Sequence, residues 1–366
     1  MKRIAVFCDG TWQKPNVSDQ TNVVKLARIV SPQSKDGTSQ IVYYDPGVGS
    51  KRGTKTRGGL LGKGLNTNIM QAYLFLALNY EAGDEIYLFG YSRGAYTVRS
   101  LAGLIYCCGL LKREGFGSLE EAMQLYRDPE ITPGHNESVE FRKKIGDRTG
   151  DGLDPGRIPI KFLGCFDTVG ALGVPDVWPL IPLDKWLNRK YRFHDHFLNR
   201  KIEFAAHAVA ADEVRKPFHY VTMEVPPSQK ETQLSQMWFP GVHGSVGGGK
   251  VEQAPLADGP LLWIKDLASG GFGSGSDVPS LEFEMDVLSE ELRPAPNPSA
   301  DYADSFKGFM KIAGRKSRDF KGISETNDID KSVVIRMNER EDYFPKALSS
   351  IEKILKERIE RLFAPR

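Results

Sequence analysis

The stretch Gly90-Tyr91-Ser92-Arg93-Gly94 is the part of this 366-residue sequence with the clearest capacity for chemistry. It lies between residues 85–89, an apolar run typical of a buried strand, and residues 95–106, a run typical of a helix. Gly-x-Ser-x-Gly in that setting is the pattern of a nucleophile elbow, a sharp turn that presents a serine hydroxyl at a helix N-terminus. Ser92 is therefore a candidate nucleophile. The alternative is a tight turn in which Ser92 only caps the helix.

A glycine-rich loop at residues 240–249 carries a candidate base, His243. The loop follows residues 235–239, which we predict to be a strand. An imidazole that must reach a nucleophile is well placed there, because the glycines leave its backbone uncrowded. His207 lies instead among alanines and valines in residues 201–213, which we predict to be a helix, and it is more typical of a core histidine.

Two aspartates between Ser92 and His243 could orient the imidazole. Asp167 follows residues 158–166, a predicted buried strand, which would carry it to the carboxyl edge of the sheet. Asp212 ends the predicted helix beside Glu213 and an arginine, where a salt bridge is enough to explain it. We predict Asp167 as the acid and keep Asp212 as the alternative. An ordinary turn aspartate would also explain Asp167.

The elements that must position these residues alternate along the chain. Further strands are predicted at residues 3–8 and 40–44, and further helices at residues 21–30, 65–80 and 258–268. Strand, helix, strand, turn and helix in succession predict right-handed βαβ units and a mostly parallel central sheet flanked by helices, an α/β fold.

We expect a single domain over residues 1–366, with three irregular segments. Residues 112–157 are charged and glycine-rich and predict an insertion, which could act as a lid or be a plain surface excursion. Residues 270–300 predict a Gly/Ser/Pro-rich connection. Residues 301–366 form a C-terminal segment, whose amphipathic helix at residues 349–363 should pack on the domain.

Composition excludes several classes of protein. Lysine and arginine number 49 against 47 acidic residues, a net charge of +2, so we expect no nucleic-acid partner. No run approaches the about 18 apolar residues of a membrane span, so no transmembrane segment is expected. The apolar run at residues 4–8 is shorter than a signal-peptide core, which favours a cytoplasmic location. The four cysteines lie in apolar surroundings without metal-ligand spacing, which indicates reduced, buried thiols.

Other loops could bind phosphate or metal. Residues 50–64 and 244–250 resemble phosphate loops, but Gly64 and Val251 follow the lysines where a Mg²⁺-binding serine or threonine is required. The pair His194 and His196 could hold zinc only with further ligands, so we predict no metal. A nucleotide-binding protein, or an inactive hydrolase fold that binds a partner, remains the alternative to an enzyme.

Four segments together resemble an uncharacterised α/β-hydrolase family that includes the type VI secretion phospholipase effectors. They contain Asp9-Gly10-Thr11-Trp12, the serine motif, Asp167-Thr168-Val169-Gly170 and the histidine loop, at residues 6–12, 89–96, 162–170 and 238–249. The likeness extends to about residue 268, with a further echo at residues 332–345. The chain departs from the family at Gly244-Ser245, where Ser-Asp is usual, and at Phe166, where tryptophan is usual.

The resemblance implies an α/β-hydrolase-like fold and a serine ester hydrolase. Ser92 would be the nucleophile, His243 the base and Asp167 the acid, acting through an acyl-enzyme without metal or cofactor. The backbone N–H groups of Arg93 and of Gly10 or Thr11 would form the oxyanion hole. A small-molecule or lipid ester is the implied substrate. If the protein is a secreted effector, an immunity or carrier protein is a possible partner, and export without a signal peptide by a contact-dependent secretion system is implied.

Overall fold

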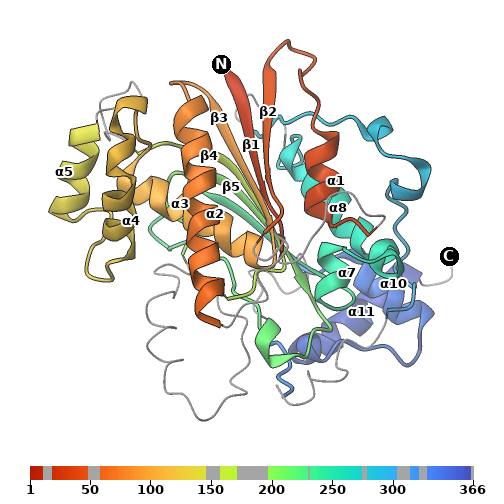
Figure 1. Ribbon diagram of the computed structural model, residues 1–366. Coiled ribbons are helices and arrows are strands. Elements are labelled where there is room, and N and C mark those ends of the chain that lie inside the picture. The colour runs from red at the N-terminus through yellow and green to blue at the C-terminus, as the bar shows by residue number, and fades with distance from the viewer. Residues whose placement is uncertain are drawn as a thin grey trace.

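The chain is described by a computed structural model (Figure 1). The structure describes residues 1–10, 19–47, 58–145, 157–170, 197–229, 231–273, 278–302, 314–320 and 328–363, without the side chains of residues 58–63.

A six-stranded parallel sheet forms the centre of the described chain (Figure 1). The strands are β1 (Lys2–Cys8), β2 (Ser39–Asp45), β3 (Glu85–Tyr91), β4 (Ile160–Phe166), β5 (Ile202–Ala210) and β6 (Gln233–Phe239). Their order is β2-β1-β3-β4-β5-β6, and every neighbouring pair is parallel. The chain therefore reverses its direction across the sheet at β1, and the crevice beyond the carboxyl ends of β1 and β3 is the usual ligand site of such sheets. The predicted α/β fold with a parallel sheet is confirmed.

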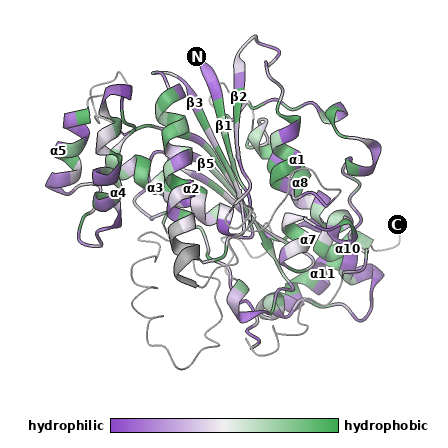
Figure 2. Ribbon diagram, viewed as in Figure 1, coloured by the Kyte–Doolittle hydropathy of each residue, from purple (hydrophilic) through white to green (hydrophobic). Residues whose placement is uncertain are grey.

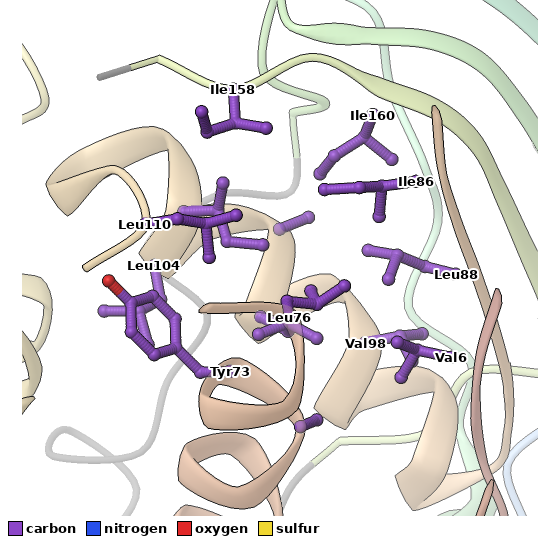
Figure 3. Close-up of a cluster of buried hydrophobic side chains, with 14 of the residues drawn as sticks. Val6, Tyr73, Leu76, Ile86, Leu88, Val98, Leu104, Leu110, Ile158 and Ile160 are labelled. Atoms are coloured by element: carbon purple, nitrogen blue, oxygen red, sulfur yellow. The ribbon is translucent and has the colours of Figure 1, made fainter. Parts of the chain in front are cut away.

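One face of the sheet is covered by α2 (Gly58–Asn79) and α3 (Arg93–Cys108), on the left in Figure 1. Alternate residues of β1, including Val6, point to this face because side chains alternate across a strand. Figure 3 shows Val6, Leu76, Leu88 and Val98 in one fully buried cluster. Burying such side chains is worth about 1.5–3 kcal/mol each.

The other face packs against α1 (Asn22–Ile29) and α8 (Ala254–Ala268). Phe7 of β1 and Phe89 of β3 stack here with their ring centroids 4.7 Å apart. Thr21 caps α1 by accepting the N–H of Val24 at 3.2 Å, which fixes where this helix begins. In the hydropathy colouring of Figure 2 these helices carry both hydrophobic and hydrophilic residues, and the buried apolar residues of α1, α3 and α8 belong to the cores on the two faces of the sheet.

The segment predicted to be an insertion, residues 112–157, is helical in its described part. It contains the 3₁₀ helix η1 (Arg113–Ser118) and the helices α4 (Leu119–Arg127) and α5 (Asn136–Ile145). Ala122, Met123 and Phe141 join the core cluster of α2 and α3. The described part therefore packs on the outer side of α3, and the segment's role as a lid stays a prediction.

The predicted connection at residues 270–300 contains two short 3₁₀ helices, η4 (Met285–Val287) and η5 (Glu290–Leu292). Leu281 and Leu288 are buried in the same core as α1 and α8. Gln40 of β2 donates its side-chain N–H to Glu282 O at 3.0 Å. The connection thus covers the edge of the sheet at β2.

The C-terminal segment packs against the opposite edge of the sheet, at β6. It contains α10 (Lys331–Glu339), η6 (Lys346–Ile351) and α11 (Glu352–Phe363), at the lower right in Figure 1. Trp238 of β6 donates its backbone N–H to Asp328 O at 2.8 Å and forms a bridge with Ile329. Val333, Leu348 and Leu355 complete a separate apolar cluster around this contact.

Residues 201–213, predicted to be a helix, form strand β5 instead. The four alanines of β5 are fully buried, Ala205 in the core beneath α2 and α3 and the other three in the core beneath α1 and α8. A strand covered by helices on both faces has no polar side, so its sequence lacks the alternation that marks a half-exposed strand. Pairing with β4 and β6 outweighs the helix propensity of alanine here.

Candidate active site

Ser92 lies in the turn between β3 and α3 with φ 57° and ψ −119°. This conformation costs about 1–3 kcal/mol for a residue with a Cβ and persists only where the surroundings enforce it. The Ser92 N–H donates to Phe166 O at the end of β4 (3.0 Å), which ties the turn to the neighbouring strand. The Ser92 side chain makes no capping hydrogen bond to α3. The geometry is therefore that of an elbow and not of a serine-capped turn.

The two glycines of the motif allow close backbone packing around Ser92. A Cβ at Gly90 would lie 2.6 Å from the Cα of Ala95, and a Cβ at Gly94 would lie 1.9 Å from Cys8 O. Real Cβ atoms do not approach backbone so closely, so both positions require glycine. The Gly94 contact fixes the start of α3 against the end of β1.

His243 begins the short helix α7 (His243–Gly247), and its ring lies between Ser92 and Asp167. Its Nε2 is 2.9 Å from Ser92 Oγ, and its Nδ1 is 2.6 Å from Asp167 Oδ2. A carboxylate on Nδ1 fixes the proton there and leaves Nε2 to accept the Ser92 hydroxyl. The three side chains thus form one continuous hydrogen-bonded chain.

The imidazole of His243 is enclosed by two aromatic rings. Tyr91 lies 4.8 Å from it and Phe218 4.9 Å, measured between ring centroids, and Phe218 belongs to the 3₁₀ helix η2 (Lys216–Phe218). The backbone N–H of His243 donates to Glu213 Oε2 at 3.1 Å. Burial lowers the pKa of His243 below its usual value, although the hydrogen bond and charge of Asp167 oppose that change. Burial therefore favours the neutral form of the ring.

Asp167 follows β4 directly, in a left-handed conformation with φ 42°, and is fully buried. Besides His243, its carboxylate accepts the N–H of Ala210 at 2.9 Å and two N–H groups of Arg318 at 2.5 and 2.8 Å. Burial alone would raise the pKa of Asp167, but the positive charge of Arg318 and the hydrogen bonds hold it well below its usual range. Asp167 is therefore an anion at neutral pH.

The alternative acid, Asp212, is used elsewhere. Its Oδ2 accepts the Gly241 N–H at 2.6 Å and the Tyr343 hydroxyl at 2.8 Å. It therefore supports the backbone leading into the histidine loop.

His207, in β5, is fully buried and bonded to other partners. Its Nε2 accepts the Thr168 N–H at 3.1 Å, and its Nδ1 is 2.9 Å from Gln236 Oε1. Burial lowers its pKa to about 3, so it stays neutral. This arrangement is that of a satisfied core histidine.

Two of the three predicted oxyanion donors, Arg93 and Gly10, belong to the described residues, and both lie close to Ser92. Arg93 is the first residue of α3, so its backbone N–H lies at the positive end of the helix. Gly10 adjoins the serine, since a Cβ at Gly10 would lie 3.6 Å from Ser92 Cβ, but its N–H donates to Asp9 Oδ1 at 2.7 Å. Asp9 also accepts the hydroxyl of Thr21 at 2.6 Å, so it shapes the turn after β1. Thr11 lies outside the described residues.

The other predicted binding features give no second site in the described residues. In residues 244–250, the helix α7 and the following turn pack into the core, where a Cβ at Gly247 would lie 2.0 Å from the Tyr91 ring. No group of three or more potential metal ligands gathers in the part of the chain that the structure describes. His194 and His196 lie outside it, as does part of residues 50–64.

Sequence reasoning did not find the site role of three charged residues, Arg318, Glu213 and Arg215. Glu213 accepts two N–H groups of the Arg215 side chain at 2.8 and 2.7 Å while holding the His243 backbone. Arg318 lies 151 positions after Asp167 in a polar stretch with no motif. Only the folded arrangement of the C-terminal segment shows that it reaches the site.

A parallel sheet with a serine elbow after one strand, an aspartate after the next and a histidine after the last is the arrangement of α/β-hydrolases. The family model described as "T6SS, Phospholipase effector Tle1-like, catalytic domain" matches residues 2–266 of this chain. The chain therefore belongs to that family of type VI secretion phospholipase effectors, as the resemblance of its motifs predicted.

Individual relatives are more distant. An uncharacterised protein of Saccharomyces cerevisiae, YEL023C, is 32% identical over 195 residues, which cover 47% of this chain and 27% of the yeast protein. A solved structure of an uncharacterised Pseudomonas aeruginosa protein has 16% identity and a TM-score of 0.48, covering 82% of this chain and 49% of the other. The structure of the Tle1 effector bound to the VgrG spike of the type VI secretion system has 20% identity and a TM-score of 0.37, covering 69% and 52%.

The chain thus spans about a quarter of the curated relative and about half of each solved structure. Within the described residues, no single helix is both long and apolar enough to cross a membrane. The pair Arg93–Cys108 and Arg113–Arg127, bent by 106°, meets that criterion only when its two arms are counted together.

Proposed function

We propose that this chain is a serine hydrolase that cleaves a carboxylic ester of a lipid, as lipases and phospholipases do, through a Ser92–His243–Asp167 triad. The observation that carries the proposal is the unbroken hydrogen-bonded chain from Ser92 Oγ through the His243 ring to Asp167, with Ser92 held on a strained elbow. Membership of a phospholipase effector family supports the ester as the bond that is cleaved.

The first half of the reaction forms an acyl-enzyme. Ser92 Oγ attacks the ester carbonyl carbon while His243 Nε2 takes the hydroxyl proton. Asp167 offsets the positive charge that the imidazole then carries, and its contact with Nδ1 prevents the ring from turning away. As the tetrahedral intermediate collapses, the C–O bond to the alcohol breaks and His243 returns the proton to the departing alcohol oxygen.

The second half regenerates the enzyme. Water attacks the acyl carbon of the Ser92 ester, and His243 takes a proton from that water. The carboxylic acid leaves as Ser92 Oγ recovers its proton from His243.

The developing oxyanion needs hydrogen-bond donors next to Ser92. We assign one to the backbone N–H of Arg93, at the start of α3, and the second to the turn after β1, from Gly10 or Thr11. Each such donor typically contributes about 3 kcal/mol to lowering the barrier. Gly10 can serve only if its N–H leaves Asp9 Oδ1, its acceptor in this structure.

Membership of the family supports a substrate class and a route of delivery. A phospholipid ester fits a phospholipase effector, and export by the type VI secretion system, with a carrier or immunity protein as partner, fits the same membership. Hydrolysis of an ester panel with graded acyl chains and with or without a phosphate head group would establish the preferred substrate.

Labelling with a fluorophosphonate tests the mechanism directly, because this reagent reacts with an activated serine and leaves ordinary serines unmodified. The wild-type protein should be labelled on the peptide that contains Ser92, as read by mass spectrometry. Ser92→Ala should lose labelling and ester hydrolysis to below about a hundredth of the wild-type rate while keeping its fold, because it removes the nucleophile and little else.

Ser245→Ala is the matched control. Ser245 is also buried, two residues after His243, and its hydroxyl has no hydrogen-bond partner among the described residues. This variant should be labelled at the wild-type rate. A folded wild-type protein that is not labelled at any pH would contradict the hydrolase proposal and favour an inactive fold or a nucleotide-binding protein.

A further inference from the structure

One residue from outside the region matched by the family model reaches the candidate active site. Arg318 is 2% exposed and donates two N–H groups to the Asp167 carboxylate, from Nη1 to Oδ1 at 2.5 Å and from Nη2 to Oδ2 at 2.8 Å. Each terminal nitrogen also donates to a backbone carbonyl, Nη1 to Ala210 O at 2.9 Å and Nη2 to Phe218 O at 2.6 Å, whereas Nε has no hydrogen-bond partner among the described residues. The guanidinium is therefore held in one orientation.

We propose that Arg318 is a positioning residue of the active site, which orients the Asp167 carboxylate toward His243 and partly neutralises its charge. The proposal rests on the hydrolase function argued above. A triad aspartate normally meets the imidazole and backbone donors, whereas here the Arg318 guanidinium, a cation, also bonds it. A planar fork matches a carboxylate edge, which a lysine cannot do.

The segment that carries Arg318 is fastened across the site. Residues 314–320 run antiparallel to the chain before η2, with the Lys316 N–H donating to Val214 O at 2.9 Å and the Lys216 N–H donating to Gly314 O at 3.2 Å. The Tyr220 hydroxyl donates to Asp319 O at 2.7 Å. This strap lies about fifty residues beyond the matched region, so the site is incomplete without the C-terminal segment.

The charge of Arg318 should set the basicity of His243. An unshared Asp167 anion would favour the protonated imidazole more strongly, whereas the arginine reduces that attraction. The other groups facing the His243 ring and backbone come from β3 and the elbow, from β4 and from the chain after β5, namely Tyr91, Ser92, Asp167, Glu213, Arg215 and Phe218. Arg318 bonds the Asp167 carboxylate and the Phe218 carbonyl, and its replacement leaves the charged residues Glu213 and Arg215 in the chain.

Two substitutions separate charge from geometry. Arg318→Met removes both. The acid limb, the rise of the fluorophosphonate labelling rate with pH as His243 loses its proton, should therefore move to higher pH by about one unit. The rate at the plateau above this limb should fall about 100-fold, because the base is misplaced. Arg318→Lys keeps the charge and loses the fork, so its limb should stay near that of the wild type while the plateau falls. A purely structural role would not move the limb.

Arg336→Met is the matched control. Arg336 is equally buried in the C-terminal segment, but it donates to Pro298 O and Ala300 O, both at 2.7 Å, and stacks over Tyr343 and Tyr302. Its loss should lower the melting temperature without moving the acid limb.

The pKa of His243, followed by NMR of ring-labelled histidine, gives a readout that does not require catalysis. It should rise by about one unit in Arg318→Met. An unchanged midpoint in folded Arg318→Met overturns the proposal. If Arg318→Met does not fold, the test is the labelling rate of Arg318→Lys, and a wild-type rate in Arg318→Lys overturns the proposal. A wild-type protein that never labels contradicts the hydrolase function, while the NMR titration still tests Arg318.

Discussion

At the scale of single residues, the pH dependence of the reaction is set by His243. Only the neutral imidazole can take the proton of Ser92, so the rate rises as pH passes upward through the pKa of His243. Burial lowers that pKa. We therefore expect the acid limb of kcat/KM, or of fluorophosphonate labelling, to have its midpoint below the ordinary imidazole value of about 6.5.

Two other groups near the site titrate well below this limb, but Asp9, in the turn after β1, does not, because burial raises its pKa to about 7. Burial lowers the pKa of His207 to about 3, and the pKa of Asp167 lies well below its usual range. A profile measured between about pH 4.5 and 8 on the folded protein, with its stability checked at each pH, should show the limb of His243 below about 6.5, separate from any step near pH 7, which would report Asp9. A midpoint above about 7 would mean that Asp167 outweighs burial, contrary to this account.

Motif and order along the chain were sufficient to nominate Ser92, Asp167 and His243, and the structure brings these side chains into contact. The roles assigned to them stay predictions until the serine is labelled. Arg318 could not be nominated, because a single arginine in a polar stretch carries no pattern. Its position depends on how residues 314–320 lie across the chain after β5.

At the scale of elements, β5 shows where periodicity fails. Strands β1 and β3 were predictable because β-branched and aromatic residues precede a turn motif in each. The run Ile202–Ala210 is rich in alanine, and its neighbours β4 and β6 are far away in sequence. Whether such a run is a strand is decided by those distant partners, which local pattern cannot register.

The elbow depends on close approach between α3 and β1, which gives a prediction about glycine. Gly94→Ala should destabilise the protein by several kcal/mol or prevent folding, because the new Cβ would lie 1.9 Å from Cys8 O and only backbone movement could relieve the clash. Urea unfolding, with labelling of Ser92 in parallel, measures the effect.

Gly259→Ala in α8 is the matched control, since it also replaces a helical glycine. A Cβ there meets no atom within 4 Å other than those of its chain neighbours and of the helix's own nearby backbone, so alanine introduces no clash with another element. Because Pro260 follows and disfavours the helical conformation of a residue with a Cβ before it, the stability should change by less than about 1 kcal/mol. If Gly94→Ala were as stable as the wild type, the close packing described for the elbow would be wrong.

At the scale of the whole molecule, the C-terminal segment extends the hydrolase core at its β6 edge. The amphipathic pattern of residues 349–363 predicted a helix that packs on the domain, and α11 does bury Leu355. The sequence could not indicate where it docks. The docking position is set by Trp238 of β6, which is fully buried and forms a bridge with Ile329.

The last prediction concerns whether the chain is a single domain. Leu348 is fully buried in the cluster shared by β6 and the C-terminal helices, so Leu348→Ala should cost about 2–5 kcal/mol. In one cooperative unit, that loss lowers the unfolding midpoint of the sheet and of the C-terminal segment equally. Tryptophan fluorescence and circular dichroism should then give coincident urea transitions, shifted together.

Leu362→Ala is the control. Leu362 is 57% exposed in α11, so this substitution should change stability by less than about 0.5 kcal/mol. Separate transitions, with only the C-terminal one shifted in Leu348→Ala, would show that residues 301–366 fold independently of the sheet, and the strap that carries Arg318 would then be expected to detach before the sheet unfolds.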